Sequence, residues 1–157
     1  MKQFTLILAF LLTLGATAQE TTFKKFYNIH KDKSAFSLNL SASFAGAFLS
    51  DDDNDEIKKI LKKSGDFKLM VFENEDSEVS KDFKRYVRKY KLTTLMRVKE
   101  SDGNAEFFIL EKNDRVKEII LRASDDNEKL VLFGLKTDMT KEELAEIFSD
   151  SNIKITK

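Results

Sequence analysis

Residues 94–135 carry a hydrophobic pattern that repeats every two residues and is interrupted by short polar turns. Such alternation is typical of strands that have one buried face. The turns are Asp102–Gly103, Asn113–Asp114 and residues 125–127, and their residue types favour tight hairpins. The pattern therefore predicts four consecutive strands that pair as an antiparallel meander.

The same pattern predicts which side chains share a face of the sheet. Residues 107–110 and 119–121 are apolar at every position, which favours central strands covered on both faces. The first strand alternates instead, so its side chains are expected to point to opposite faces in turn. One face would carry Thr94, Met96 and Val98, and the other would carry Leu95, Arg97 and Lys99.

The rest of the chain favours helices and two further strands. Residues 78–91 hold an apolar stripe with the period of an amphipathic helix. A shorter helix is expected over 22–32, and a capping box opens a last helix at Thr140. Compact apolar segments at 35–40 and 67–72 are expected to be strands. The predicted fold class is α+β: a four-stranded antiparallel meander plus additional strands, backed by amphipathic helices.

The first 18 residues have the features of a cleavable secretory signal. Lys2 precedes an apolar run at 4–14, and Ala16-Thr17-Ala18 supplies the small residues that signal peptidase requires. The apolar run is shorter than the roughly 20 residues that span a bilayer. We therefore expect residues 1–18 to be a signal peptide, residues 19–157 to form a single domain, and the protein to be periplasmic or secreted.

The charge and cysteine content narrow the classes of function. Without residues 1–18 the chain loses one basic residue, Lys2, and keeps 26 basic and 27 acidic residues, a net charge of −1. Such a balance creates no overall field that attracts nucleic acid, so we expect no nucleic-acid partner. The chain has no cysteine, which excludes disulfides and thiol chemistry.

The inventory of reactive side chains is small. His30 is the only histidine, so it would have to be the base of any serine–histidine relay. A zinc site would have one histidine and no cysteine as ligands. The acidic run 51–56 starts like an EF-hand loop but lacks the required glycine and final glutamate, which favours helix capping. We expect no cofactor, no metal and no catalytic residue. A carboxylate-based hydrolase stays as the enzymatic alternative, because acidic residues are numerous.

Two surface features are candidate contact sites. The helix over 78–91 carries basic residues opposite its apolar stripe, among them Lys84, Arg85, Arg88 and Lys89. A solvated outer face is favoured, and the alternative is anionic-lipid binding through the Lys81–Lys91 helix. Phe44 and Phe48 stand among small residues, and exposed together they would form a protein contact.

Several segments resemble one known family in their order along the chain. They are Phe23-Lys24-Lys25-Phe26-Tyr27, Leu95-Met96-Arg97-Val98-Lys99 before an Asp-Gly turn, Val116-Lys117-Glu118-Ile119-Ile120-Leu121, the strand at 132–135 and the Thr140 helix. With them the chain resembles the domain-of-unknown-function 4252 family of exported Bacteroidetes proteins. The resemblance implies a small envelope or periplasmic protein, and its motifs are structural rather than catalytic.

The leading hypothesis from the sequence is a non-catalytic periplasmic or envelope domain that works through protein or surface contacts. A well-patterned fold beside few reactive groups favours this hypothesis. The expected partners are an envelope protein or an anionic membrane surface. No transmembrane span is expected after signal cleavage, because no later segment is long and apolar enough.

Overall fold

A computed structural model describes the greater part of the chain, namely residues 21–41, 63–74, 78–126 and 128–150. The expected signal peptide, the acidic run and the pair Phe44 and Phe48 lie outside the described residues, so these interpretations stay predictions.

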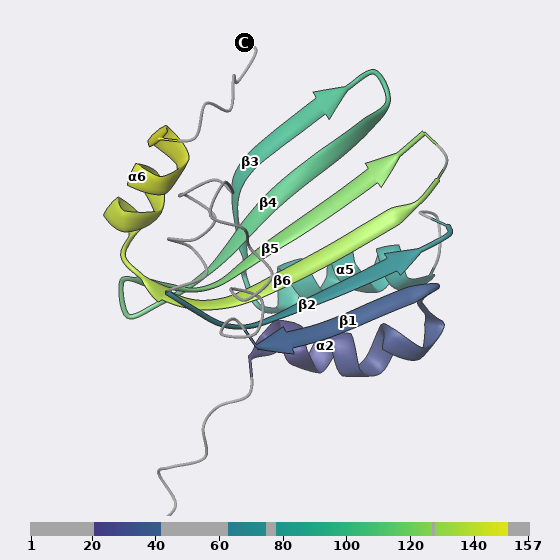
Figure 1. Cartoon of the computed structure of the whole chain (residues 1–157), viewed down its shortest axis with the longest axis horizontal. Helices are drawn as coiled ribbons and strands as arrows, with labels where there is room; N and C mark the ends of the chain where they lie inside the picture. The colour runs from purple at the N-terminus through teal and green to yellow at the C-terminus, as the bar shows by residue number, and fades with distance from the viewer. Residues whose placement is uncertain (1–20, 42–62, 75–77, 127, 151–157) are drawn as a thin grey trace, which may run out of the picture.

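Six strands of the described chain form one antiparallel sheet (Figure 1). In chain order they are β1 (Phe36–Ser41), β2 (Ser64–Phe72), β3 (Thr93–Glu100), β4 (Gly103–Lys112), β5 (Arg115–Asp125) and β6 (Leu130–Met139). Their spatial order is β1-β2-β6-β5-β4-β3, so the last four strands form the predicted meander. β2 pairs with β6 and β1 pairs with β2. The α+β class is confirmed.

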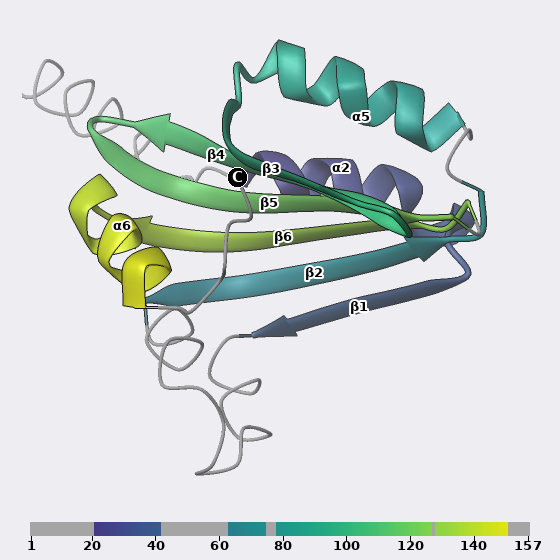
Figure 2. The same ribbon diagram turned by 90° about the horizontal axis from the view of Figure 1, so that it is seen from above.

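Helices cover the two faces of this sheet unequally. α2 (Thr22–His30), followed by the short 3₁₀ turn η1 (Lys31–Lys33), and α5 (Glu78–Lys89) lie on one face. α6 (Lys141–Asp150) lies on the opposite face near one end of the strands (Figure 2). We refer to these faces as the α2–α5 side and the α6 side.

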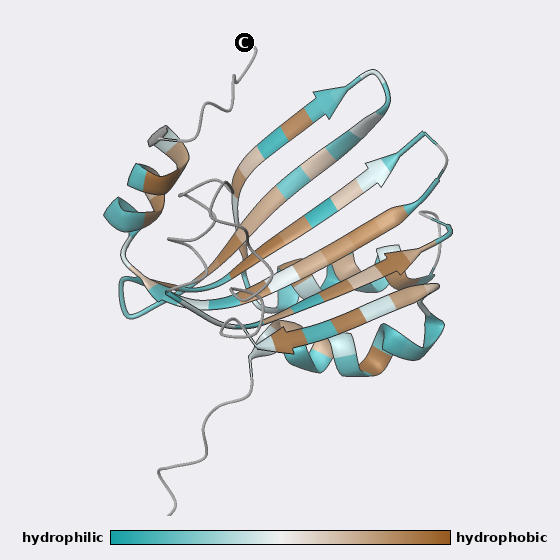
Figure 3. Ribbon diagram, in the orientation of Figure 1, coloured by the Kyte–Doolittle hydropathy of each residue, from teal (hydrophilic) through white to brown (hydrophobic). Residues whose placement is uncertain are grey.

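Each face has its own apolar core, and Figure 3 shows the matching alternation of hydrophobic and hydrophilic bands along the strands. On the α2–α5 side, the ring of Phe83 contacts the rings of Phe26 and Phe108, with centroids 5.8 Å apart in both pairs. On the α6 side, Leu144 and Ile147 belong to a second cluster with residues of β4, β5 and β6. The double-sided apolar strands are therefore buried on both faces where helices cover them, as predicted.

The three hairpins of the meander are confirmed, although one glycine has a different role from the one expected. Asn113 and Asp114 have φ angles of 54° and 57°, the left-handed pair that a type I′ turn needs. Gly103 has no positive φ and already belongs to β4. A Cβ atom on Gly103 would lie 2.4 Å from the carbonyl oxygen of Ser124. Close approach of β5, rather than turn conformation, therefore requires this glycine.

A β-bulge at Leu95 changes the faces of β3. Thr94 pairs with Phe108 and Met96 pairs with Phe107, so Leu95 is an extra residue between two registered pairs. One extra residue shifts the in–out alternation by one position. Thr94 and Met96 therefore lie on opposite faces, and the prediction that they share a face is wrong.

The N-termini of helices α6 and α2 are capped in different ways. At the start of α6, the Thr140 amide donates to Glu143 Oε2 at 2.8 Å and the Glu143 amide donates to Thr140 Oγ1 at 3.1 Å, which confirms the predicted capping box. At the start of α2, the N-cap Thr21 Oγ1 accepts from the Lys24 amide at 3.4 Å, and a second acceptor comes from β5. Glu118 is 3% exposed and accepts hydrogen bonds from the amides of Thr22 and Phe23 at 2.7 and 2.9 Å.

Candidate functional site

The basic residues predicted on α5 lie together on its outer face. Lys84, Arg85, Arg88 and Lys89 are all exposed, while Phe83 and Tyr86 face the sheet. The Arg85 guanidinium donates to Asp82 Oδ1 at 2.7 Å. The exposure of these side chains agrees with both interpretations of the sequence, a solvated outer face and a surface that binds anionic lipid.

α2 lies beside α5 and enlarges this charged surface. Ring contacts join the two helices, with the Phe26 centroid 5.1 Å from that of Tyr86. Residues 21–33 and 78–91 together hold ten basic side chains, and all ten are exposed: Lys24, Lys25, Lys31, Lys33, Lys81, Lys84, Arg85, Arg88, Lys89 and Lys91. We call this surface the basic layer.

The basic layer carries most of the charge asymmetry of the protein. Its two segments contain three acidic residues, Asp32, Glu78 and Asp82, so ten positive and three negative charges leave a net charge of +7. The whole chain has 27 basic and 27 acidic residues. All other residues together therefore carry a net charge of −7.

A shallow groove between α2 and α5 gives this layer an apolar element. Ile29 is 68% exposed and lines the groove together with Lys25, Arg85 and Lys89. A large apolar side chain among cations is typical of surfaces that meet lipid head groups. The lysines of α2 were missed in the sequence, because nothing in the local spacing shows that α2 packs beside α5.

His30 lies beneath this layer and is packed rather than available as a base. It is 3% exposed, its ring centroid is 4.3 Å from that of Phe26, and its Nε2 lies 3.8 Å from Asp82 Oδ2. Burial lowers the pKa of His30 below its usual value, and the nearby Asp82 carboxylate opposes this shift. His30 is therefore a packed side chain of the α2–α5 side.

A second pocket, of about 350 Å³, lies at the start of α2. Four lysines line it, one each from α2, β4, β5 and β6: Lys25, Lys112, Lys117 and Lys136. Glu118 and Thr137 also contribute to the wall. We call this site the lysine pocket. No local pattern in the sequence predicts it, because its residues are far apart along the chain.

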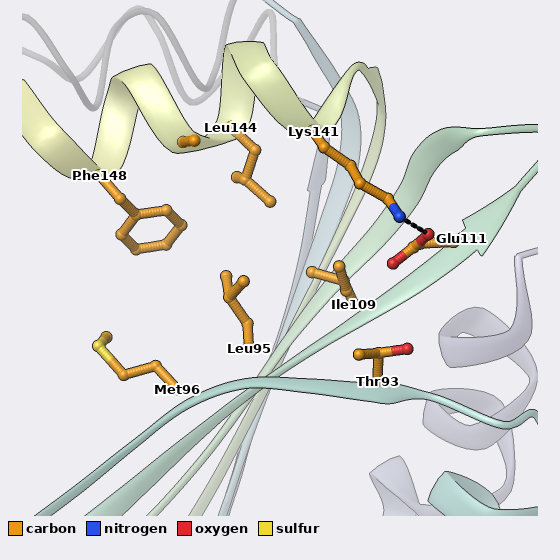
Figure 4. A pocket seen from close by; sticks show the side chains of 9 residues that line it. Thr93, Leu95, Met96, Ile109, Glu111, Lys141, Leu144 and Phe148 are labelled. Atoms are coloured by element: carbon orange, nitrogen blue, oxygen red, sulfur yellow. Dashed lines mark ion pairs between the residues drawn. The ribbon is translucent and has the colours of Figure 1, made fainter.

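A third pocket, of about 500 Å³, lies on the α6 side between α6 and the strands β3 and β4 (Figure 4). Its walls are mainly apolar and include Leu95, Met96, Leu144 and Phe148, whose side chains point toward one another in the close view. At one end, Lys141 Nζ lies 2.6 Å from Glu111 Oε2. The β-bulge is what brings Leu95 and Met96 into this apolar pocket together.

The described pockets do not bring carboxylates together as a hydrolase requires. The lysine pocket holds one carboxylate, Glu118, and the apolar pocket holds one, Glu111. Glu100 and Asp102 line a common depression, but both are exposed on a hairpin. Over the described residues, no group of three or more histidine or acidic side chains is placed to hold a metal ion. The hydrolase alternative gains no support here and stays a hypothesis.

Comparison with models of known protein families shows which family the chain belongs to. The model of a domain of unknown function, DUF4252, matches residues 26–147. The chain belongs to the DUF4252 family. The match to DUF4252 runs from α2 to α6 and includes all six strands of the sheet. Neither the curated proteins nor the solved structures that were compared contain a significant match. Within the described part of this DUF4252 chain, no helix has the length and apolar character needed to cross a membrane.

Proposed function

We propose that this protein is an exported, non-catalytic domain of the periplasm or envelope that works by contact with an anionic membrane surface. The observation that carries the proposal is the basic layer, which concentrates a net charge of +7 on one face of a chain whose total charge is zero. The features of a signal peptide at residues 1–18 support export. Exposed Ile29, in the groove between α2 and α5, supplies an apolar group on the same face.

The physics of charged surfaces explains why this layer suits a membrane. Each lysine or arginine close to an anionic leaflet contributes about 1 kcal/mol of attraction. The attraction decays within a Debye length, about 8 Å at physiological ionic strength. Only a flat face that presents many cations at once therefore gains from it, and α2 and α5 lie on one face of the sheet. The negative remainder of the chain favours an orientation with that face toward the membrane.

Loss of two cations from the basic layer should weaken binding to anionic vesicles. For the double variant Lys84→Gln/Arg88→Gln we expect a fall in the partition coefficient on phosphatidylglycerol vesicles of about tenfold or more at low salt. Both side chains are exposed, so the fold should be unaffected. Vesicle co-sedimentation measures the effect, and added salt should abolish binding of the parent protein.

The matched control is Lys99→Gln/Lys129→Gln, which removes the same charge from exposed lysines outside the layer. The control should retain most of the binding. Equal binding by the parent and the layer variant would contradict the proposed function.

A second candidate function is a protein contact at the edge of the sheet. β3 pairs only with β4 among the described strands, so its other edge is available in this part of the chain. The apolar pocket lies beside that edge, and Leu95 at its rim is 42% exposed. An extended segment of a partner protein that adds to β3 would place an apolar side chain in the pocket.

A photo-crosslinking residue tests this second candidate in intact cells. We expect one at position 95, in place of Leu95, to give a discrete adduct with an envelope protein. One at position 129, in place of the exposed Lys129, serves as the control and should give none. The same adduct pattern from both positions, or no adduct from position 95, would refute the β3 contact.

A further inference from the structure

We infer that the apolar pocket beside α6 and the adjoining sheet face bind one single-chain lipid that has an uncharged, hydroxyl-bearing head group. Such a site goes beyond the proposed function and does not depend on it, because the basic layer lies on the opposite face of the sheet. A lipid bound there would compete with the β3 contact for the same pocket. Three features of the α6 side carry the inference: the charge at one end of the pocket, the apolar rows of the sheet beside it, and the position of α6.

The pocket is charged at one end and apolar at the other (Figure 4). At the charged end, Lys141 Nζ lies 2.6 Å from Glu111 Oε2. Phe148 follows Lys141 by about 10 Å along the axis of α6 and lines the apolar end together with Met96. Such a gradient suits an amphiphile, with its polar head beside the ion pair and its tail toward Phe148.

A row of apolar side chains crosses the whole sheet from the apolar end of the pocket. Met96 lines the pocket and pairs with Phe107, and the pairing continues strand by strand to Leu38 on β1. The six members of this row are Met96, Phe107, Leu121, Phe133, Leu69 and Leu38, and none of them is fully buried. The Phe107 ring centroid lies 6.2 Å from that of Phe148, which places the row on the α6 side.

The neighbouring row extends this apolar surface. It runs from Val98 on β3 to Phe36 on β1, and all six of its side chains are apolar and at least partly exposed. Six strands at about 4.8 Å spacing give each row a length of about 24 Å. An acyl chain in one leaflet extends about 15 Å, half of the hydrocarbon core of a bilayer. The rows are therefore long enough for a whole acyl chain.

The shape and chemistry of this face favour an acyl chain over a second copy or an extended peptide. α6 projects from the same face (Figure 2), and a helix about 10 Å across prevents a second sheet from reaching the spacing of about 10 Å at which sheets pack. An extended peptide would lay its backbone N–H and C=O groups on side chains that offer no nitrogen or oxygen partner. An acyl chain has no such groups, and a pocket of about 500 Å³ admits it.

The ion pair at the charged end determines which head group fits. Lys141 and Glu111 have opposite charges, so together they present no net charge to a ligand. An ammonium group has three donors and a carboxylate has two acceptor oxygens, so both groups have hydrogen-bonding capacity beyond their mutual contact. A hydroxyl donates as well as accepts and therefore suits both partners, whereas a charged head group would lie beside a like charge.

Titration calorimetry with three amphiphiles of equal tail length tests the head-group preference. The probes are monodecanoylglycerol, decanoate and decyltrimethylammonium, each below its micelle-forming concentration. We expect saturable binding of the glycerol ester, about tenfold tighter than the binding of either charged probe. Glu111→Gln leaves the Lys141 ammonium without its carboxylate partner, so this variant should reverse the preference in favour of decanoate.

A bulky side chain in the pocket tests the location of the site. Ala145 is exposed and lines the pocket, so Ala145→Phe should occupy part of the pocket without disturbing the core. We expect this variant to weaken binding of monodecanoylglycerol about tenfold or more. Ser149→Phe is the matched control, because it adds the same ring to α6 at an exposed position outside the pocket, and it should leave binding unchanged.

The inference would be overturned by any of three results. The first is the absence of saturable binding of monodecanoylglycerol. The second is binding that Ala145→Phe leaves unchanged, or a head-group preference that Glu111→Gln leaves unchanged. The third is a dimer, detected by analytical ultracentrifugation, whose formation excludes the glycerol ester, since this result would assign the face to a second copy.

Discussion

Replacement of Gly134 by alanine is expected to lower the free energy of unfolding by about 3 kcal/mol, near the upper end of overpacking effects. A Cβ atom at Gly134 would lie 1.9 Å from Cδ1 of Phe23, which is far inside van der Waals contact. Phe23 has no room to retreat, because it is buried and its ring contacts those of Phe26 and Tyr86. Either α2 must lift from β6 or the ring must leave its place in the core.

Gly65→Ala is the matched control for this prediction, since Gly65 also lies in a strand of the same sheet. Its added Cβ would meet Lys136 Cδ at 3.2 Å, and the end of a flexible side chain moves at little cost. We expect a change below about 1 kcal/mol for this control. Urea unfolding of both variants measures the difference. Similar losses for Gly134→Ala and Gly65→Ala would show that α2 does not sit on β6 as described.

Removal of the Glu118 carboxylate is expected to lower the free energy of unfolding by about 3 kcal/mol or more. Glu118→Ala would leave the buried amide of Phe23, the amide of Thr22 and the Thr22 hydroxyl without their acceptor. Helix caps alone contribute about 1 kcal/mol, and here the acceptor is a buried charge with three donors. Glu118→Gln should lower the free energy of unfolding by less, because the side-chain amide keeps one acceptor oxygen.

Urea unfolding together with hydrogen exchange at the Thr22 and Phe23 amides measures this effect. Both amides should exchange faster in Glu118→Ala, because the first turn of α2 loses its link to β5. Glu146→Ala, an exposed glutamate on α6, is the control and should change stability by less than about 0.5 kcal/mol. Unchanged protection of the Phe23 amide in Glu118→Ala would rule out the cap.

Local sequence patterns predicted much of this fold because they report local structure. The stripe on α5, the Thr140 capping box and the alternation of the meander each depend on residues a few positions apart. The bulge at Leu95 was not predictable in this way. In the sequence, residues 94–99 show a regular alternation that is typical of a strand. The extra residue becomes visible only in the pairing of β3 with β4.

The candidate sites depend more on long-range contacts, and the sequence predicted them less completely. The basic residues of α5 can be predicted from the helical period of that segment alone. The basic residues of α2 join the same surface only because α2 packs beside α5 through Phe26 and Tyr86. The lysine pocket joins Lys25 to Lys136, and the α2 cap joins Thr22 to Glu118, 96 positions away. No spacing rule connects residues at such separations, because only the tertiary fold brings them together.

The place of β6 in the sheet has a consequence for how the chain assembles. β6 is the last of the six described strands along the chain, yet it lies between β2 and β5. The nearest pairing of β2 with β6 joins Phe72 to Leu130, 58 positions later. Until β6 has paired, β2 keeps one strand edge open even when its other edge is paired with β1. A chaperone that shields this edge until β6 pairs would therefore protect the folding chain from aggregation.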